Sequence, residues 1–166
     1  MIFLARSIAT VGFVGHLRPA PGTWGSLAAF PIGWVIWEIG GLWLFLIAIP
    51  VAFAKGMWAI PRITQGAEDP DFSEIVIDEV VGQWIALVPV ALGAYFSGAS
   101  LPALWPGLLI AFVAFRAFDI LKPGPVKWAD QRKDAWGVML DDVIAGWLAS
   151  LVVVVLAYVA HGMMGV

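Results

Sequence analysis

Residues 75–96 read IVIDEVVGQWIALVPVALGAYF, an apolar stretch with an acidic pair, Asp78 and Glu79, near its start. A helix needs roughly 20 apolar residues to cross the hydrocarbon core of a bilayer, so this stretch predicts a membrane-spanning helix. Ionised groups at that depth are costly and usually face the interior of a helical bundle or a water-filled cavity. The stretch therefore predicts both a membrane fold and a polar site at one end of a helix.

The composition of the whole chain agrees with a membrane fold. Of 166 residues, 61% are hydrophobic and 13% are charged, and the mean hydropathy is +0.92. Soluble domains average about 45–50% apolar and about 25% charged residues. We therefore expect residues 1–166 to form a single membrane-embedded, all-α domain. The chain has no cysteine, which excludes disulfides, thiolate metal sites and a cysteine nucleophile.

Further hydrophobic stretches extend the prediction to a compact bundle of about four to five helices. They cover residues 26–39, 42–57, 102–121 and 138–160. Gly40-Gly41 separates the first two and favours a tight turn between helices. The first is short for a span and contains Pro31 and Glu38, so residues 26–57 are expected either to span the bilayer or to form a re-entrant hairpin.

The N-terminal residues 1–15 are apolar but contain Arg6. They lack a charged start followed by a cleavage signal, so we do not interpret them as a secretory signal. An interfacial or re-entrant segment is the expectation for this region.

The positive charges predict the orientation of the bundle. If consecutive helices alternate in direction, residues 40–41 and 97–101 share one membrane face, and the loops at 15–25, 55–74 and 122–137 share the other. All 9 Lys and Arg residues lie on or near the second face. The positive-inside rule then makes the second face cytoplasmic.

The same alternation brings acidic residues together at one depth, from the start of the third helix, the end of the fourth and the start of the fifth. So many carboxylates would repel each other unless a cation lay among them, and hard divalent cations take carboxylate, water and phosphate oxygens as ligands. The sequence therefore predicts a metal site at a membrane surface. The candidate ligands are Asp78, Glu79, Asp119, Asp141 and Asp142.

Alternative roles exist for some of these acids. Glu74 and Asp78 are four residues apart, so they would share a helix face, with Glu79 turned about 100° away. Acids at a helix start also interact favourably with the helix dipole, which explains Glu74 but explains Asp78-Glu79 less well, because the preceding residues are already apolar. Adjacent Asp141 and Asp142 would point in different directions, so one could bind metal while the other orients a ligand or a water.

Cationic residues near the acids are candidates for binding phosphate. Arg116 and Asp119 are three residues apart on one predicted helix, where they could form an ion pair. Asp119 could also bind metal while Arg116 and Lys122 contact phosphate, and the two roles need not exclude each other. Asp130 and Asp134 lie in a cationic loop; we interpret Asp134 as a solvated charge and leave Asp130 open.

The segment PAPGTWGS, residues 19–26, opens the first predicted helix. Backbone amides at a helix N-terminus can bind an anion, which would make Thr23 a phosphate contact. The alternative is that Thr23 or Ser26 caps the helix.

Four segments together resemble the phosphatidylglycerophosphatase A family. They occur in the family's order and are APGTWGSLAAFP at 20–31, IVIDEVVG at 75–82, FRAFDILKP at 115–123 and GVMLDDVIAG at 137–146. The resemblance implies a Mg²⁺-dependent enzyme of the bacterial inner membrane, active on its cytoplasmic side. It implies hydrolysis of phosphatidylglycerol phosphate to phosphatidylglycerol and phosphate in phospholipid biosynthesis, with the bilayer as a partner and no nucleic acid.

Carried onto matching positions, the resemblance implies a metal site at the five acids named above. Its phosphate-site residues would be Thr23, Arg116 and Lys122, and its catalytic residues would be Asp78, Glu79 and Asp142. Water would attack the phosphorus, and Glu79 or Asp142 would take its proton. The alternative is an ion-coupled transporter, but such sites usually lie near the bilayer midplane and often accompany internal repeats.

Overall fold

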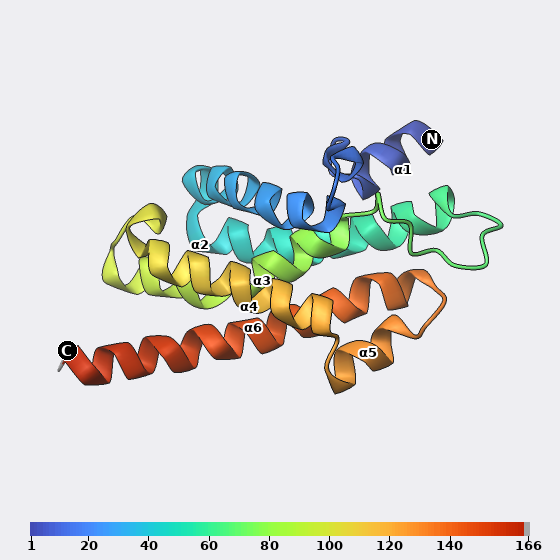
Figure 1. Ribbon diagram of the computed structural model, residues 1–166. Helices are drawn as coiled ribbons and strands as arrows, with labels where there is room; N and C mark the ends of the chain where they lie inside the picture. The colour runs from blue at the N-terminus through green and yellow to red at the C-terminus, as the bar shows by residue number, and fades with distance from the viewer. Residues whose placement is uncertain (165–166) are drawn as a thin grey trace.

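The computed structural model describes residues 1–164, and these form a bundle of helices (Figure 1). In chain order the elements are α1 (Ile2–Ala9), η1 (Val14–His16), α2 (Pro21–Ile63), α3 (Ile77–Ser97), η2 (Leu101–Leu104), α4 (Trp105–Leu121), α5 (Gly124–Asp130) and α6 (Ala135–Met164). Among the described residues, 4 regions are long and apolar enough to cross a membrane: Pro21–Ile63, Ile77–Ser97, Leu101–Leu121 and Ala135–Ala160. The expectation of an all-α membrane protein is confirmed.

The long helix α2 is a hairpin of two arms. Gly41 has non-helical backbone angles, φ 63° and ψ −154°, which glycine adopts without steric cost. The chain reverses there, and the two arms lie side by side (Figure 1). At 1.5 Å per residue, residues 21–40 rise about 30 Å, the thickness of a hydrocarbon core, so the first arm is long enough to span. It begins at Pro21 rather than at residue 26 because proline suits the first turn of a helix.

The helices alternate in direction as the sequence predicted. The α2 turn and the loop between α3 and α4 lie at one end of the bundle, and the loops that follow α2 and α4 lie at the other (Figure 1). The short helix α5 lies between α4 and α6, where the sequence predicted only a loop over residues 122–137. The N-terminal helix α1 is also at this end, with Ala5 and Ala9 buried and Ile2, Phe3 and Leu4 exposed.

Helix α3 is the centre of the bundle and packs against α2, α4 and α6. Its crossing with α6 is close because both helices present glycine. A Cβ atom at Gly82 would lie 2.6 Å from the carbonyl oxygen of Asp142, and one at Gly146 would lie 2.4 Å from that of Gly82. Small residues let two helix backbones approach in this way.

The start of α3 differs from the prediction. The helix begins at Ile77, so Glu74 lies outside it, and the expectation that Glu74 and Asp78 share a helix face is wrong. The cause is tertiary: the Val76 N–H donates a hydrogen bond to the Ala9 carbonyl over 2.9 Å, which holds Val76 out of the helix. Asp78 and Glu79 consequently lie in the first turn of α3.

Candidate active site

Three carboxylates from α3 and α6 form the centre of the site. Asp78, Glu79 and Asp142 each offer an oxygen atom within 4.8 Å of the others. Asp78 is 6% exposed and Asp142 is 3% exposed. The glycine crossing explains why they meet, because Asp78 precedes Gly82 by four residues and Asp142 precedes Gly146 by four residues, one helical turn in each case.

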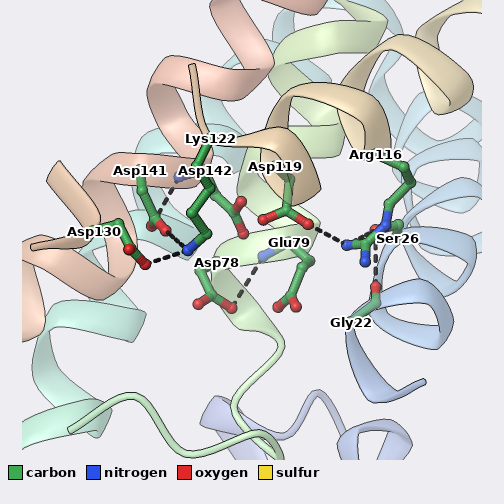
Figure 2. A network of polar contacts seen from close by, with 10 residues as sticks. All are labelled: Gly22, Ser26, Asp78, Glu79, Arg116, Asp119, Lys122, Asp130, Asp141 and Asp142. Carbon is green, nitrogen blue, oxygen red and sulfur yellow. Dashed lines mark hydrogen bonds and ion pairs between the residues drawn. The ribbon is translucent and has the colours of Figure 1, made fainter. Parts of the chain in front are cut away.

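Helix α4 contributes an ion pair beside this cluster. Arg116 Nη1 lies 2.6 Å from Asp119 Oδ2, and the two residues are one helical turn apart in α4. Arg116 also donates to the Ser26 hydroxyl over 3.4 Å, and Ser26 donates to the Gly22 carbonyl over 2.9 Å. Figure 2 shows Arg116 pointing from α4 towards the start of α2. The guanidinium is therefore held between the acid cluster and α2.

Gly22 completes the contact between α2 and the cluster. A Cβ atom there would lie 2.3 Å from Glu79 Oε1 and 3.2 Å from Arg116 Nη1. The first turn of α2 therefore approaches both charged groups through a residue without a side chain.

Lys122 closes the opposite side of the site. Its ammonium donates to Asp130 and, over 3.0 Å, to Asp141 (Figure 2). Burial lowers the pKa of Lys122, but these two hydrogen bonds outweigh burial, so the pKa is raised above the ordinary value and the group stays charged. Lys122 is positioned by the end of α4, where it takes a left-handed conformation with φ 44°.

These groups surround a polar cavity of about 140 Å³. Its charged lining consists of Asp71, Asp78, Glu79, Asp119, Lys122, Asp130, Arg132, Asp141 and Asp142. Within the described residues, Glu79 Oε2 and Asp142 Oδ1 are buried and have no hydrogen-bond partner. Buried carboxylate oxygens without partners are destabilising unless a cation or a proton satisfies them. The donor set therefore fits a hard divalent cation such as Mg²⁺.

The structure brings most of the predicted site residues together. The five predicted acids line one cavity, Lys122 lines it as well, and Arg116 lies beside it. The contacts that join α2 to the site come from Gly22, just before Thr23, and from Ser26, three residues after it, so a phosphate contact at Thr23 stays a prediction. Helix α2 has Ala20 at its N-cap position and no capping side-chain hydrogen bond, so capping by Thr23 or Ser26 is wrong.

Several residues of the site were not anticipated. Ser26 could have been found from its spacing, because it lies one turn after Gly22 on the same helix face. Asp71 and Arg132 come from loops whose path has no sequence signal. Gln83 is fully buried one turn after Glu79, and among the described residues neither of its amide atoms has a partner.

The two loop aspartates have different surroundings. Asp130 binds Lys122 and so belongs to the site. Asp134 caps α6 instead: its Oδ1 accepts the Gly137 N–H over 2.9 Å, and its other oxygen pairs with Arg132 at 2.7 Å. The side chain of Asp134 is 47% exposed, in agreement with a solvated charge.

Comparison with known proteins identifies the family. The family model described as Phosphatidylglycerophosphatase A matches residues 7–157. A Phosphatidylglycerophosphatase A of Haemophilus influenzae is 38% identical over 154 residues, covering 91% of this chain and 88% of the relative. The protein of the same name from Escherichia coli K12 is 30% identical over 145 residues, covering 86% and 78%.

A third relative has a different name. A Putative phosphatidylinositol-3-phosphatase of Bacteroides thetaiotaomicron is 34% identical over 163 residues, covering 95% of this chain and 96% of the relative. No solved structure matches the chain. The resemblance found in the sequence is confirmed by the family model and the first two relatives, and the chain belongs to the phosphatidylglycerophosphatase A family.

Proposed function

We propose that this protein is a lipid phosphatase that hydrolyses phosphatidylglycerol phosphate to phosphatidylglycerol and inorganic phosphate, in phospholipid biosynthesis. The observation that carries the proposal is the buried cluster of Asp78, Glu79 and Asp142, with Arg116 and Lys122 beside it, at one end of a membrane bundle. Membership of the phosphatidylglycerophosphatase A family supports the choice of substrate.

The acid cluster would hold Mg²⁺. Asp78, Glu79 and Asp142 would be its ligands, and Asp119 and Asp141, which line the same cavity, could add to them. When bound, Mg²⁺ supplies a Lewis acid that polarises the phosphate and lowers the pKa of a water.

Arg116 and Lys122 would bind the phosphate. The Nε of Arg116 is buried without a partner among the described residues, so a donor remains after the guanidinium has bound Asp119 and Ser26. Arginine binds phosphate through two donors and lysine as a point charge. Both would stabilise the negative charge that develops on the equatorial oxygens in the transition state.

A carboxylate would act as the base. The water oxygen forms a bond to phosphorus, the bond from phosphorus to the glycerol oxygen breaks, and the proton released by the water moves to a carboxylate and then to the leaving glycerol oxygen. Glu79 Oε2 and Asp142 Oδ1 are the candidates, because both are free of other hydrogen bonds in the described part of the chain, and the base would be the one of the two that does not hold the cation.

The site would face the cytoplasm at the inner membrane of a bacterium. Arg116, Lys122, Lys127, Arg132 and Lys133 belong to the end of α4 and the loop that follows it, at the same end of the bundle as the acids. The positive-inside rule assigns such an end to the cytoplasm. The transporter alternative is disfavoured, because the acids do not lie at mid-helix: Asp78 and Glu79 are in the first turn of α3, and Asp141 and Asp142 are within the first eight residues of the 30-residue helix α6.

Substrate choice is tested by measuring phosphate release from four lipids in detergent micelles with Mg²⁺. The lipids are phosphatidylglycerol phosphate, phosphatidic acid, phosphatidylinositol 3-phosphate and, as a control without a monoester, phosphatidylglycerol. We expect the highest kcat/KM on phosphatidylglycerol phosphate. A preference for the inositol lipid would move the function towards that named for the Bacteroides relative, and release from none of the lipids would overturn the proposal.

A further inference from the structure

A second cavity, which is apolar, lies towards the end of the bundle opposite the acidic one, since Leu101 and Pro102 of η2 line it. Its volume is about 190 Å³, and it lies between the first arm of α2, α3 and the region that contains η2 and α4. The cavity is not fully enclosed, and Trp34 at its edge is 49% exposed. The residues that matter here are Phe30, Trp34, Leu87, Ala91, Leu101 and Leu108.

Two helices, α2 and α4, lead from the phosphate end of the active site to this cavity. On α2, Ser26, Phe30 and Trp34 follow one another at intervals of four residues, so they lie on one face. On α4, Arg116 and Leu108 are eight residues apart, or about 12 Å along the axis. We call the line along which α2 and α4 face each other the seam: it begins at the Arg116–Ser26 contact (Figure 2) and ends where Phe30, Trp34 and Leu108 line the cavity.

A pair of aromatic rings crosses the seam between its two ends. The rings of Phe30 and Phe112 meet edge to face, with centroids 6.1 Å apart. Both side chains are half-buried, so their outer surfaces form an apolar path between the charged end and the cavity. The seam thus changes from charged to apolar in the direction in which a phospholipid changes from phosphate to hydrocarbon.

We propose that this seam binds an acyl chain of the lipid substrate while its phosphate lies between Arg116 and Lys122. The proposal rests on the proposed function. The glycerol would pass Ser26, and the chain would run over Phe30 and Phe112 into the cavity at Leu108. Lipid tails are already in apolar surroundings, so the seam gains little from removing hydrocarbon from water. Its effect is to orient the lipid and so to place the phosphate.

Substitution at the cavity tests this role in catalysis. Leu108→Trp would fill the cavity, whereas Leu109→Trp is a matched control, because Leu109 is 53% exposed and does not line the cavity. The substrates are phosphatidylglycerol phosphates with two 16-carbon chains or two 6-carbon chains. We expect Leu108→Trp to lower kcat/KM about tenfold on the long-chain lipid only, the result of poorer orientation. An equal loss on both lipids, or equal behaviour of the two variants, would overturn the proposal.

Photo-crosslinking of the unmodified protein tests occupancy without relying on turnover. The probe is phosphatidic acid with a diazirine in the middle of one chain, and the comparison is phosphatidylcholine with the same chain. We expect phosphatidic acid to label residues 30–34 and 101–108, and phosphatidylcholine to label them weakly. Equal labelling by both lipids, or labelling by phosphatidic acid spread over the exposed residues Leu151, Val154, Val155 and Leu156, would overturn it. Labelling of the seam in a protein that releases no phosphate would separate a failed function from a failed binding site.

Discussion

Gly146 on α6 lies against the backbone of Gly82 on α3, so closely that a Cβ atom at position 146 would come within 2.4 Å of the Gly82 carbonyl oxygen. One helical turn earlier, the same two helices present Asp142 and Asp78 to the candidate active site. The distance between the two helices therefore sets the distance between two of the carboxylates. The fold and the site depend on one contact.

Substitution of Gly146 by Ala should separate α3 from α6. We expect a loss of about 1–3 kcal/mol in the free energy of unfolding, as for overpacked cores, together with a loss of phosphatase activity. Gly93→Ala is the control, because a Cβ atom there would meet only Leu104 Cδ1 at 3.7 Å. Thermal unfolding and phosphate release in detergent measure both effects. Equal stability of the two variants would contradict the close crossing.

Gly22→Ala should affect activity more than stability. The new methyl group would meet the end of the flexible Glu79 side chain at 2.3 Å, so the carboxylate can swing away with little cost to the fold. Its displacement from Asp78 and Asp142 should lower kcat at least tenfold, since misplaced catalytic groups lose rate steeply. Steady-state kinetics and thermal unfolding separate the two effects. Wild-type kcat in this variant would show that Glu79 does not need its observed position.

Lys122→Met should remove a charge next to the substrate phosphate and leave Asp130 and Asp141 without their shared partner. We expect kcat/KM to fall about 100-fold, the usual effect of removing one charge-stabilising donor. Lys133→Met is the matched control, because Lys133 pairs with Asp69 in an exposed loop. Similar kcat/KM values for the two variants would argue against a phosphate contact at Lys122.

Asp134 should matter for stability and not for catalysis. Asp134→Ala removes the cap of α6 and should cost about 1 kcal/mol, whereas Asp134→Asn keeps a capping side chain and should cost less. Both variants should retain wild-type turnover. A loss of turnover in a stable Asp134→Asn protein would place this residue in the site.

The same residue gives a pH prediction. A hydrogen bond from Arg132, and after it one from the Gly137 N–H, hold the pKa of Asp134 below the ordinary value of 3.8. A carboxylate with a lowered folded-state pKa stabilises the fold fully above the unfolded-state pKa, and this contribution is lost as the pH falls through the folded-state pKa. The difference in unfolding temperature between wild type and Asp134→Asn should therefore shrink below about pH 4. A difference that stays constant down to pH 3 would contradict this assignment.

Much of the fold could be predicted from the sequence because its signals are local. Apolar length predicts the spans, Gly40-Gly41 predicts the turn of α2, and alternation of direction predicts that the acids of α3, α4 and α6 meet. The start of α3 could not be predicted, since it depends on a hydrogen bond between Val76 and Ala9, which are distant in sequence.

The parts of the site that come from loops and from single contacts also escaped prediction. Two loops bring Asp71 and Arg132 to the acidic cavity, and the path of a loop leaves no periodic pattern in the sequence. The sequence suggested Thr23 as a phosphate contact on α2, which stays a prediction, and it did not indicate that the Ser26 hydroxyl, one turn later, accepts a hydrogen bond from Arg116. Which residue of a helix faces a neighbour is decided by helix packing, and the sequence near 19–26 contains several candidates.

The central claim is that the buried carboxylates hold Mg²⁺ for hydrolysis of a lipid phosphate monoester, and Asp78→Asn tests it most directly. Phosphate release from phosphatidylglycerol phosphate should require Mg²⁺, stop with EDTA and vanish in Asp78→Asn, while Asp134→Asn remains active. In EDTA, where no cation stabilises the cluster, Asp78→Asn should unfold at or above the wild-type temperature, because it removes one buried negative charge. Release that continues in EDTA, or at the wild-type rate in Asp78→Asn, would contradict the claim.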